Sequence, residues 1–173
     1  MKIIEALKKV KELRLKQDGL ILKIQQHSAD LDFETPLYPD TKEQVAGWLQ
    51  AVHDLSAEIL KLRIAVQRTN LETIVAVEVQ EGRFVKKSIA EWIHRRKDLA
   101  NIDRLAWNGL TDRGLKEGNL SPTIAGGLGR EVKIRRYFDP KERDSKIDMF
   151  RNEPSVIDRT LEVVNATTDL LAE

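Results

Sequence analysis

The chain has 173 residues, a formal net charge of +1 and no cysteine, which excludes disulfides, thiolate catalysis and cysteine zinc sites. Charged residues make up 33% and hydrophobic residues 41% of the chain, which favours long helices in contact with water over disorder. The near-neutral charge excludes strong overall steering of a polyanion, and an aromatic content of 5% argues against a broad stacking platform for bases or sugars.

Residues 3–29 carry apolar side chains at the three- and four-residue spacing of one helix face. Gln17 and Gly19 interrupt this stripe, so we expect a looser contact there. Residues 30–40 contain two prolines and are predicted to form a loop. The apolar positions of the stripe are Ile3, Leu7, Val10, Leu13, Leu20, Ile24 and Leu31.

A second helix is predicted over residues 42–69, with Thr41 as its N-cap and Gln44 completing a capping box. Its apolar positions alternate steps of three and four residues, as in the seam of a coiled coil. A connection of about ten residues between two such helices predicts an antiparallel hairpin over residues 1–71. Two helices leave part of each stripe exposed, so we expect a third helix or another subunit to cover it. The seam consists of Val45, Trp48, Val52, Leu55, Ile59, Leu62 and Val66.

A small β/α subdomain with three strands is predicted over residues 72–138. The β-branched residues 73–79 predict one strand, and residues 84–87 predict the return strand after a turn at Gly82. A third strand is predicted over residues 131–138, where apolar and basic side chains alternate.

Helical and loop segments connect these strands. Ser88 and Glu91 form a second capping box, which opens a helix that ends near Trp107. Residues 108–130 contain six of the nine glycines and are predicted to form a long loop.

The C-terminal segment is predicted to be helical. Asp139 and Pro140 supply a cap followed by proline at the first helical position, and Pro154 is expected to kink or restart the helix. The apolar stripe of this segment consists of Val156, Ile157, Leu161, Val164 and Leu171.

These elements predict an α+β fold that is predominantly α. It comprises a long helical hairpin over residues 1–71, the three-stranded β subdomain over 72–138, and a C-terminal helical segment over 139–173 that packs on the hairpin. The middle segment carries 13 basic and 9 acidic side chains, whereas the C-terminal segment carries 5 basic and 9 acidic ones. The simplest interpretation is that the acidic C-terminal helix packs beside the basic middle, within or between subunits.

Three stretches resemble a known family. They are the opening Met-Lys-Ile-Ile-Glu-Ala-Leu, the helix end from Leu62 to Asn70, and the segment from Asp158 to Leu170. All three are similar to the septicolysin-like family of small helical proteins from bacteria and phages. Ala166 stands where that family usually has tryptophan, and the 108–130 loop is longer than in the family. The resemblance implies a small helical fold, and the family's name suggests a cytolysin, but it implies no catalytic or binding residue.

Residues that could carry catalysis form no recognisable set. His27, His53 and His94 show no metal-ligand spacing, so we expect them on the surface or beside the seam. The glycine cluster at 126–129 precedes a predicted strand rather than a helix, so it does not fit a phosphate cradle. No enzyme activity, catalytic residue, cofactor or metal site is predicted.

Basic side chains near the predicted sheet are the strongest sign of a binding surface. If they share a face, they could neutralise phosphates while Phe84 and Tyr137 stack on bases. The interpretation that we favour is a solvated or intersubunit salt-bridge face. The residues are Arg83, Lys86, Lys87, Arg95, Arg96, Lys133, Arg135 and Arg136.

The leading hypothesis is therefore a non-enzymatic structural or interaction protein that forms a homo-oligomer through coiled-coil packing. A phage virion, with its other proteins as partners, is one setting for it. A nucleic-acid-binding module that uses the basic β subdomain is the alternative, and a cytolysin-like membrane-active protein is the third hypothesis. The chain shows no signal-peptide core and no stretch near the ~18 apolar residues of a membrane span, which predicts a cytoplasmic protein, or a virion protein if phage-encoded.

Overall fold

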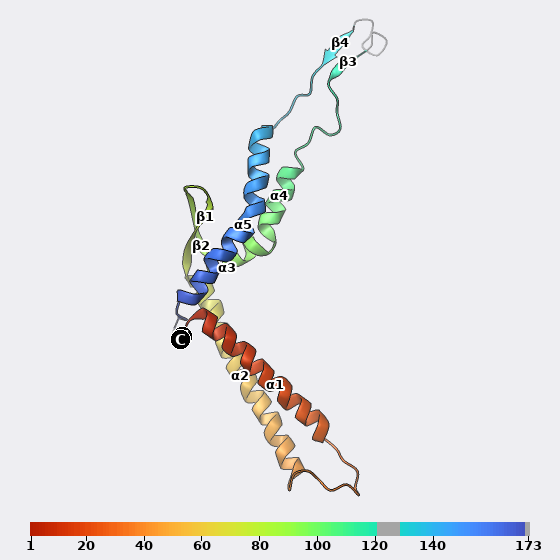
Figure 1. Cartoon of the computed structure of the whole chain (residues 1–173), viewed down its shortest axis with the longest axis vertical. Coiled ribbons are helices and arrows are strands. Elements are labelled where there is room, and N and C mark those ends of the chain that lie inside the picture. Colours follow the sequence, from red (N-terminus) through yellow and green to blue (C-terminus); the bar gives the residue numbers. More distant parts are fainter. Residues whose placement is uncertain (121–128, 172–173) are drawn as a thin grey trace. The chain divides into compact units, whose positions relative to one another are not determined.

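The computed structural model describes residues 1–120 and 129–171. Helices dominate the chain, which also contains two small two-stranded sheets (Figure 1). The elements are α1 (Ile3–His27), α2 (Thr41–Glu72), β1 (Ile74–Gln80), β2 (Arg83–Ser88), α3 (Ile89–His94), the π-helical turn η1 (Arg95–Leu99), α4 (Ala100–Asn108), β3 (Gly118–Leu120), β4 (Arg130–Val132) and α5 (Pro140–Thr167).

The chain divides into two compact units. The first comprises Met1–Val75, Lys87–Ala90 and Thr160–Glu173, and the second comprises Ala76–Lys86 and Glu91–Arg159. Helix α5 contributes its last turns to the first unit and its remainder to the second.

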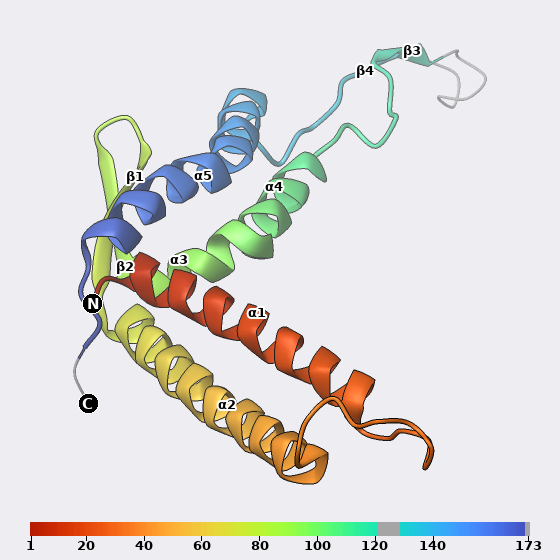
Figure 2. The same ribbon diagram turned by 60° about the horizontal axis from the view of Figure 1, so that its bottom comes forward.

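Helices α1 and α2 pack side by side and run in opposite directions, as both views show (Figures 1 and 2), which confirms the predicted helical hairpin. Apolar burial on one face of each helix holds them together. The seam residues Val45, Val52, Leu55 and Leu62 are half-buried. The buried side chains of the two helices are Ile3, Ala6, Leu13, Trp48, Ile59 and Val66.

A polar contact crosses the hairpin where the apolar stripe of α1 is interrupted. The side-chain amide of Gln17 donates to the carbonyl of Val52 at 3.1 Å and to the hydroxyl of Ser56 at 2.6 Å. Gln17 therefore joins the two helices by hydrogen bonds at a point where the sequence offers no apolar side chain.

The N-cap of α2 is Asp40, and the predicted cap at Thr41 is wrong. The Asp40 carboxylate accepts a hydrogen bond from the backbone N–H of Glu43 at 2.8 Å, and its backbone is not yet helical. Thr41 already lies in the first helical turn, and its hydroxyl donates to the carbonyl of Tyr38 at 3.4 Å. Both residues are good caps, and Asp40 takes the role because the helix starts one residue earlier than predicted.

Residues from the two ends of the chain pair within the first unit. Ile3 N–H donates to the carbonyl of Thr168 at 3.0 Å, and Leu170 N–H donates to that of Met1 at 2.8 Å. The Lys2 ammonium adds a hydrogen-bonded ion pair to Asp169 at 2.6 Å. Residues 168–170 therefore pair with residues 1–3 in a short antiparallel bridge.

The predicted three-stranded sheet is wrong, because the described strands form two separate two-stranded antiparallel sheets. Strands β1 and β2 form one hairpin, whose turn places Gly82 at a φ of 72°, where glycine is favoured. Strand β4 pairs instead with β3, with Gly118 opposite Val132.

The third strand was misplaced because its partner lies in the segment predicted to be a loop. Strand β3 is near β4 in sequence, so their pairing closes a shorter loop than pairing with β1 or β2 would. Beyond Val132 the ladder stops, since the N–H of Ile134 donates to the Glu117 carboxylate at 3.1 Å. Residues 121–128, which include most of the predicted glycine cluster, lie outside the described residues.

Helix α5 begins as predicted and then runs without interruption. The Asp139 carboxylate accepts from the N–H of Lys141 at 2.8 Å, which confirms the predicted cap before Pro140. The helix continues through Pro154, where a kink or restart was expected.

The first prediction tests the rotation of α2. Replacing the buried Ile59 by alanine should lower the free energy of unfolding by about 2–5 kcal/mol, because methyl groups are lost and a cavity remains. Replacing the neighbouring exposed Glu58 by alanine should change it by no more than ~0.5 kcal/mol. Urea unfolding of both variants measures the difference, and equal losses would contradict the assigned face.

The second prediction concerns acid pH. The hydrogen bond and charge of Lys2 hold the pKa of Asp169 below its ordinary value of 3.8, so the folded state favours the carboxylate. The stability that this pair adds is therefore present above that value and is lost as the pH falls through the lowered pKa. Thermal unfolding between about pH 5 and pH 2 should show a smaller loss for Asp169→Asn than for the wild type. Identical pH profiles for the two proteins would contradict the pairing.

Candidate functional site

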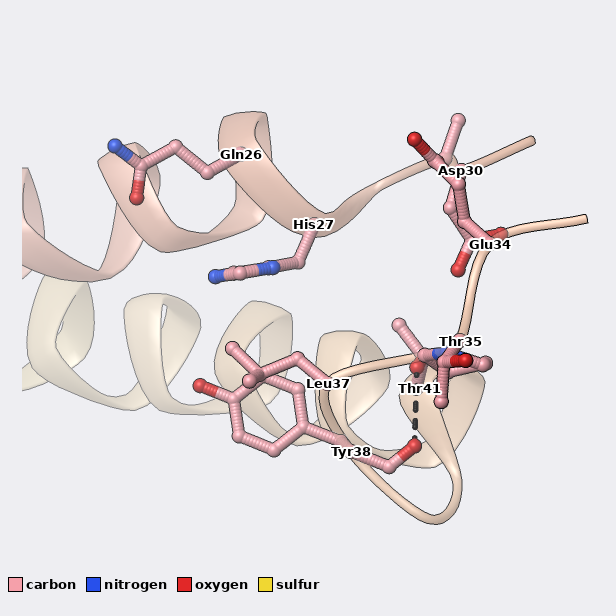
Figure 3. Close-up of a pocket in the computed structure, with 10 residues that line it drawn as sticks. Gln26, His27, Asp30, Glu34, Thr35, Leu37, Tyr38 and Thr41 are labelled. Atoms are coloured by element: carbon pink, nitrogen blue, oxygen red, sulfur yellow. Dashed lines mark hydrogen bonds between the residues drawn. The ribbon is translucent and has the colours of Figure 1, made fainter.

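A pocket of about 440 Å³ lies at the turn of the hairpin, between the end of α1 and the loop that leads to α2 (Figure 3). Its volume lies within the range of small-molecule sites, roughly 300–1,000 Å³. Polar side chains from both segments line it, notably Gln26, His27, Asp30, Glu34, Tyr38 and Thr41.

Three aromatic rings close the hairpin beside this pocket. The His27 and Tyr38 rings meet edge-on with centroids 5.4 Å apart, and Trp48 lies 5.7 Å from His27 and 5.4 Å from Tyr38. Such tilted and edge-on contacts favour aromatic packing. Trp48 is buried, and His27 is half-buried, so the histidine is part of a small packed cluster at the end of the seam.

The lining of the pocket favours cations over anions. Asp30 and Glu34 contribute carboxylates, and one oxygen of Glu34 already accepts from the N–H of Leu31 at 2.8 Å. No lysine or arginine is among the ten lining residues, although Lys42 lines a neighbouring pocket of about 270 Å³. Within residues 1–120 and 129–171, no three side chains of the metal-binding types converge.

A buried ion cluster holds the second unit together. Arg95 binds Glu153 with two hydrogen bonds, from Nε at 2.8 Å and from Nη2 at 2.7 Å, and binds Asp103 through Nη1. The Glu153 side chain is only 4% exposed and that of Arg95 18%. The guanidinium carbon also lies 5.6 Å from the centre of the Phe150 ring.

The π-helical turn η1 explains how Arg95 reaches Asp103. Asp103 follows Arg95 by eight residues, which in a regular α-helix would place the two side chains about 80° apart. The π turn takes up one extra residue, as the hydrogen bond from the Ala100 N–H to the Arg95 carbonyl shows. The remaining seven residues make about two full turns, so both side chains lie on the same face.

The cluster keeps Arg95 charged. The hydrogen bonds that Arg95 donates to Glu153 and Asp103, together with the negative charges of these carboxylates, outweigh burial and raise the pKa of Arg95 above its ordinary value. The arginine therefore neutralises two carboxylates and serves as an internal counter-ion.

Some residues of the predicted basic surface form ion pairs, and the others lie on or beside two different sheets. Arg96 pairs with Asp158 at 2.7 Å, Arg136 with Asp112 at 2.6 Å, and Lys133 with Glu131 at 3.7 Å. Arg83 and Lys86 are exposed on β2 and Lys87 is half-buried there, whereas Arg135 is exposed beyond β4.

Acidic residues of α5 form ion pairs with basic residues of the segment 72–138. Glu153 and Asp158 lie in α5 and pair with Arg95 and Arg96, so the predicted pairing of the acidic C-terminal helix with the basic middle is confirmed within the second unit. Sequence spacing gave no signal for Asp103 or Glu153 as partners of Arg95, because the first depends on the π turn and the second is 58 residues away.

A second apolar stripe runs along α2 on a face that does not contact α1. Leu49 and Leu60 each follow a buried seam residue, so they lie about 100° around the helix from it. Leu49, Leu60 and Leu71 are 54%, 61% and 65% exposed, and Ile64 lies beside them. We call Leu49, Leu60, Ile64 and Leu71 the outer stripe.

Helix α1 also exposes apolar side chains. Leu15 is 63% and Leu22 53% exposed, and both lie away from the buried residues of this helix. No helix in the described part of the chain is long and apolar enough to span a membrane.

Comparison with solved structures finds one informative match. The chain is similar to a functionally unknown conserved protein from Corynebacterium diphtheriae, with 21% identity, a TM-score of 0.55 and 99% of each chain covered. At this identity the match shows a shared fold alone. No family model and no curated protein matches the chain, so the resemblance to septicolysin-like proteins stays a hypothesis.

The third prediction tests the ion cluster. Glu153→Ala removes the buried partner of Arg95 and leaves the partly buried guanidinium paired with Asp103, whose side chain is 43% exposed. The free energy of unfolding should therefore fall by about 3–5 kcal/mol. Arg96→Ala, which breaks the exposed pair with Asp158, is the matched control and should cost no more than about 1 kcal/mol. Urea unfolding monitored by circular dichroism measures both. A loss for Glu153→Ala as small as that of the control would show that the cluster contributes little.

Proposed function

We propose that this chain is a non-enzymatic structural or interaction protein that associates with copies of itself through its helical hairpin. The observation that carries the proposal is the outer stripe of α2. Three leucines, each more than half exposed, lie on one face of a helix that already buries its seam against α1.

Exposed apolar stripes of this kind are unusual in a monomer. Isolated exposed leucines are common on protein surfaces, but apolar side chains aligned along one face usually mark an interaction site. The outer stripe runs from Leu49 to Leu71, which are 22 residues apart and therefore about 33 Å apart along the helix at 1.5 Å per residue. That length suits a helix-to-helix contact better than a site for a small molecule.

The charges of the chain support self-association over nucleic-acid binding. Four of the eight basic residues predicted to bind a polyanion instead pair with acidic side chains of the chain itself. The pocket at the hairpin turn is lined by carboxylates, which would repel phosphate. A role inside a phage virion remains part of the proposal as one setting in which such an assembly would work.

The fourth prediction is an assembly larger than the 19.8 kDa chain. Size-exclusion chromatography with light scattering should give at least twice that mass at micromolar concentration. The mass should persist at ~1 M salt, because apolar burial is not screened, whereas an assembly held by surface ion pairs would dissociate. A monomer at every concentration up to ~100 µM, a range that covers ordinary Kd values of stable dimers, would contradict the proposal.

A further inference from the structure

We infer that the outer stripe of α2 binds the same stripe of a second copy in an antiparallel, two-fold arrangement centred on Leu60. This inference rests on the proposed self-association and adds its surface and direction. The spacing of the leucines supports it, since Leu49 and Leu71 each lie 11 residues from Leu60. A two-fold axis at Leu60 therefore places Leu49 of one copy against Leu71 of the other.

The spacing also makes the stripe nearly straight. Three α-helical turns contain 10.8 residues, so side chains 11 residues apart recur on almost the same face. The whole row of leucines can thus contact a partner helix without the pronounced supercoil that a seven-residue repeat requires.

Charge along α2 selects the antiparallel direction. Within the part of α2 that the partner helix covers, residues 48–59 carry two acidic and no basic side chains, whereas residues 61–72 carry three basic and one acidic. In an antiparallel pair the acidic half of each helix faces the basic half of the other, and the two helix dipoles also oppose. Asp54 lies six residues before Leu60 and Arg68 eight residues after it, so in the antiparallel pair these two side chains lie at similar heights on the same side of the interface. In a parallel pair, each residue would lie at the same height as its own copy, so acidic half would lie beside acidic half and basic half beside basic half.

Helix α1 is the weaker candidate for the same role. It carries six basic and three acidic side chains, and both of its halves are net positive. Pairing of two α1 helices in either direction therefore sets positive charge against positive charge. Its exposed leucines, Leu15 and Leu22, supply a matched control surface.

Distances between labels measure the arrangement directly. Because the chain has no cysteine, Lys42→Cys and Glu72→Cys each introduce a single site for a spin label at an exposed position. In the full-length dimer these sites lie 18 and 12 residues from the axis, so pulsed dipolar EPR should give about 54 Å and about 36 Å along the helix. Two short distances, near the ~10 Å separation of packed helices, would overturn the antiparallel arrangement.

Two substitutions test whether the outer stripe is the surface that forms the dimer. Leu60→Asp should convert the dimer to a monomer by light scattering, while Leu22→Asp, at an equally exposed site on α1, should leave it intact. Circular dichroism should show unchanged helix content in both, since both sites are exposed. A dimer that survives Leu60→Asp overturns this inference but not self-association, whereas a monomeric wild-type protein overturns both.

A charge exchange supplies an independent check. Asp54→Lys alone and Arg68→Glu alone should each weaken the dimer, because each sets like charges against each other across the axis. The double variant restores opposite charges only in the antiparallel arrangement, so its Kd should return toward the wild-type value. If the double variant weakens the dimer by as much as the two single substitutions combined, its Kd would contradict the placement of the axis.

Discussion

Burial of one face of α2 against α1 is the constraint on which the hairpin and its surface depend. An α-helix is rigid, so fixing Trp48, Ile59 and Val66 toward α1 also fixes where every other side chain of α2 lies. The outer stripe is a direct consequence of this rotation. A single face is enough to hold a hairpin, and a helix with a second apolar face has more apolar surface than one partner covers.

The second unit depends on a different kind of interaction. There a partly buried arginine is held by two carboxylates, and a π-helical turn brings one of them to the correct face. Buried ion pairs contribute little net stability compared with apolar packing, but they are costly to break and they tolerate few alternative arrangements. The cluster therefore fixes how η1, α4 and α5 meet within this unit. It also takes up charge that would otherwise be available for binding phosphate.

The hairpin could be predicted because the residues that specify it lie close together in the sequence. Seven seam positions over three heptads indicate both the helix and its buried face, and the short connection indicates the direction of the second helix. The start of α2 was misplaced by one residue, since Asp40 and Thr41 are both good caps. The third strand was misplaced because alternation in residues 131–138 says nothing about which strand is its partner. Strand β3, which is the partner, has only three residues and no β-branched side chain.

Other features depend on information that spacing does not contain. Glu153 resembles any surface glutamate until α5 is placed beside Arg95. The pocket beside His27 forms only when the loop of residues 28–40 folds back over the end of α1. The leucines of the outer stripe are equally spaced in the sequence, but their exposure can be judged only once the face buried against α1 is known.

Thiol labelling at increasing protein concentration tests most directly whether a second copy covers the outer stripe of α2. Ala57→Cys lies at the edge of the outer stripe and keeps all of its leucines, whereas Glu58→Cys, one residue further, lies about 100° around the helix. The rate of thiol labelling at position 57 should fall as the protein concentration rises through the Kd, and the rate at position 58 should stay constant. Labelling rates at both positions that do not change with concentration would show that this face of α2 stays open to solvent, which would contradict the account.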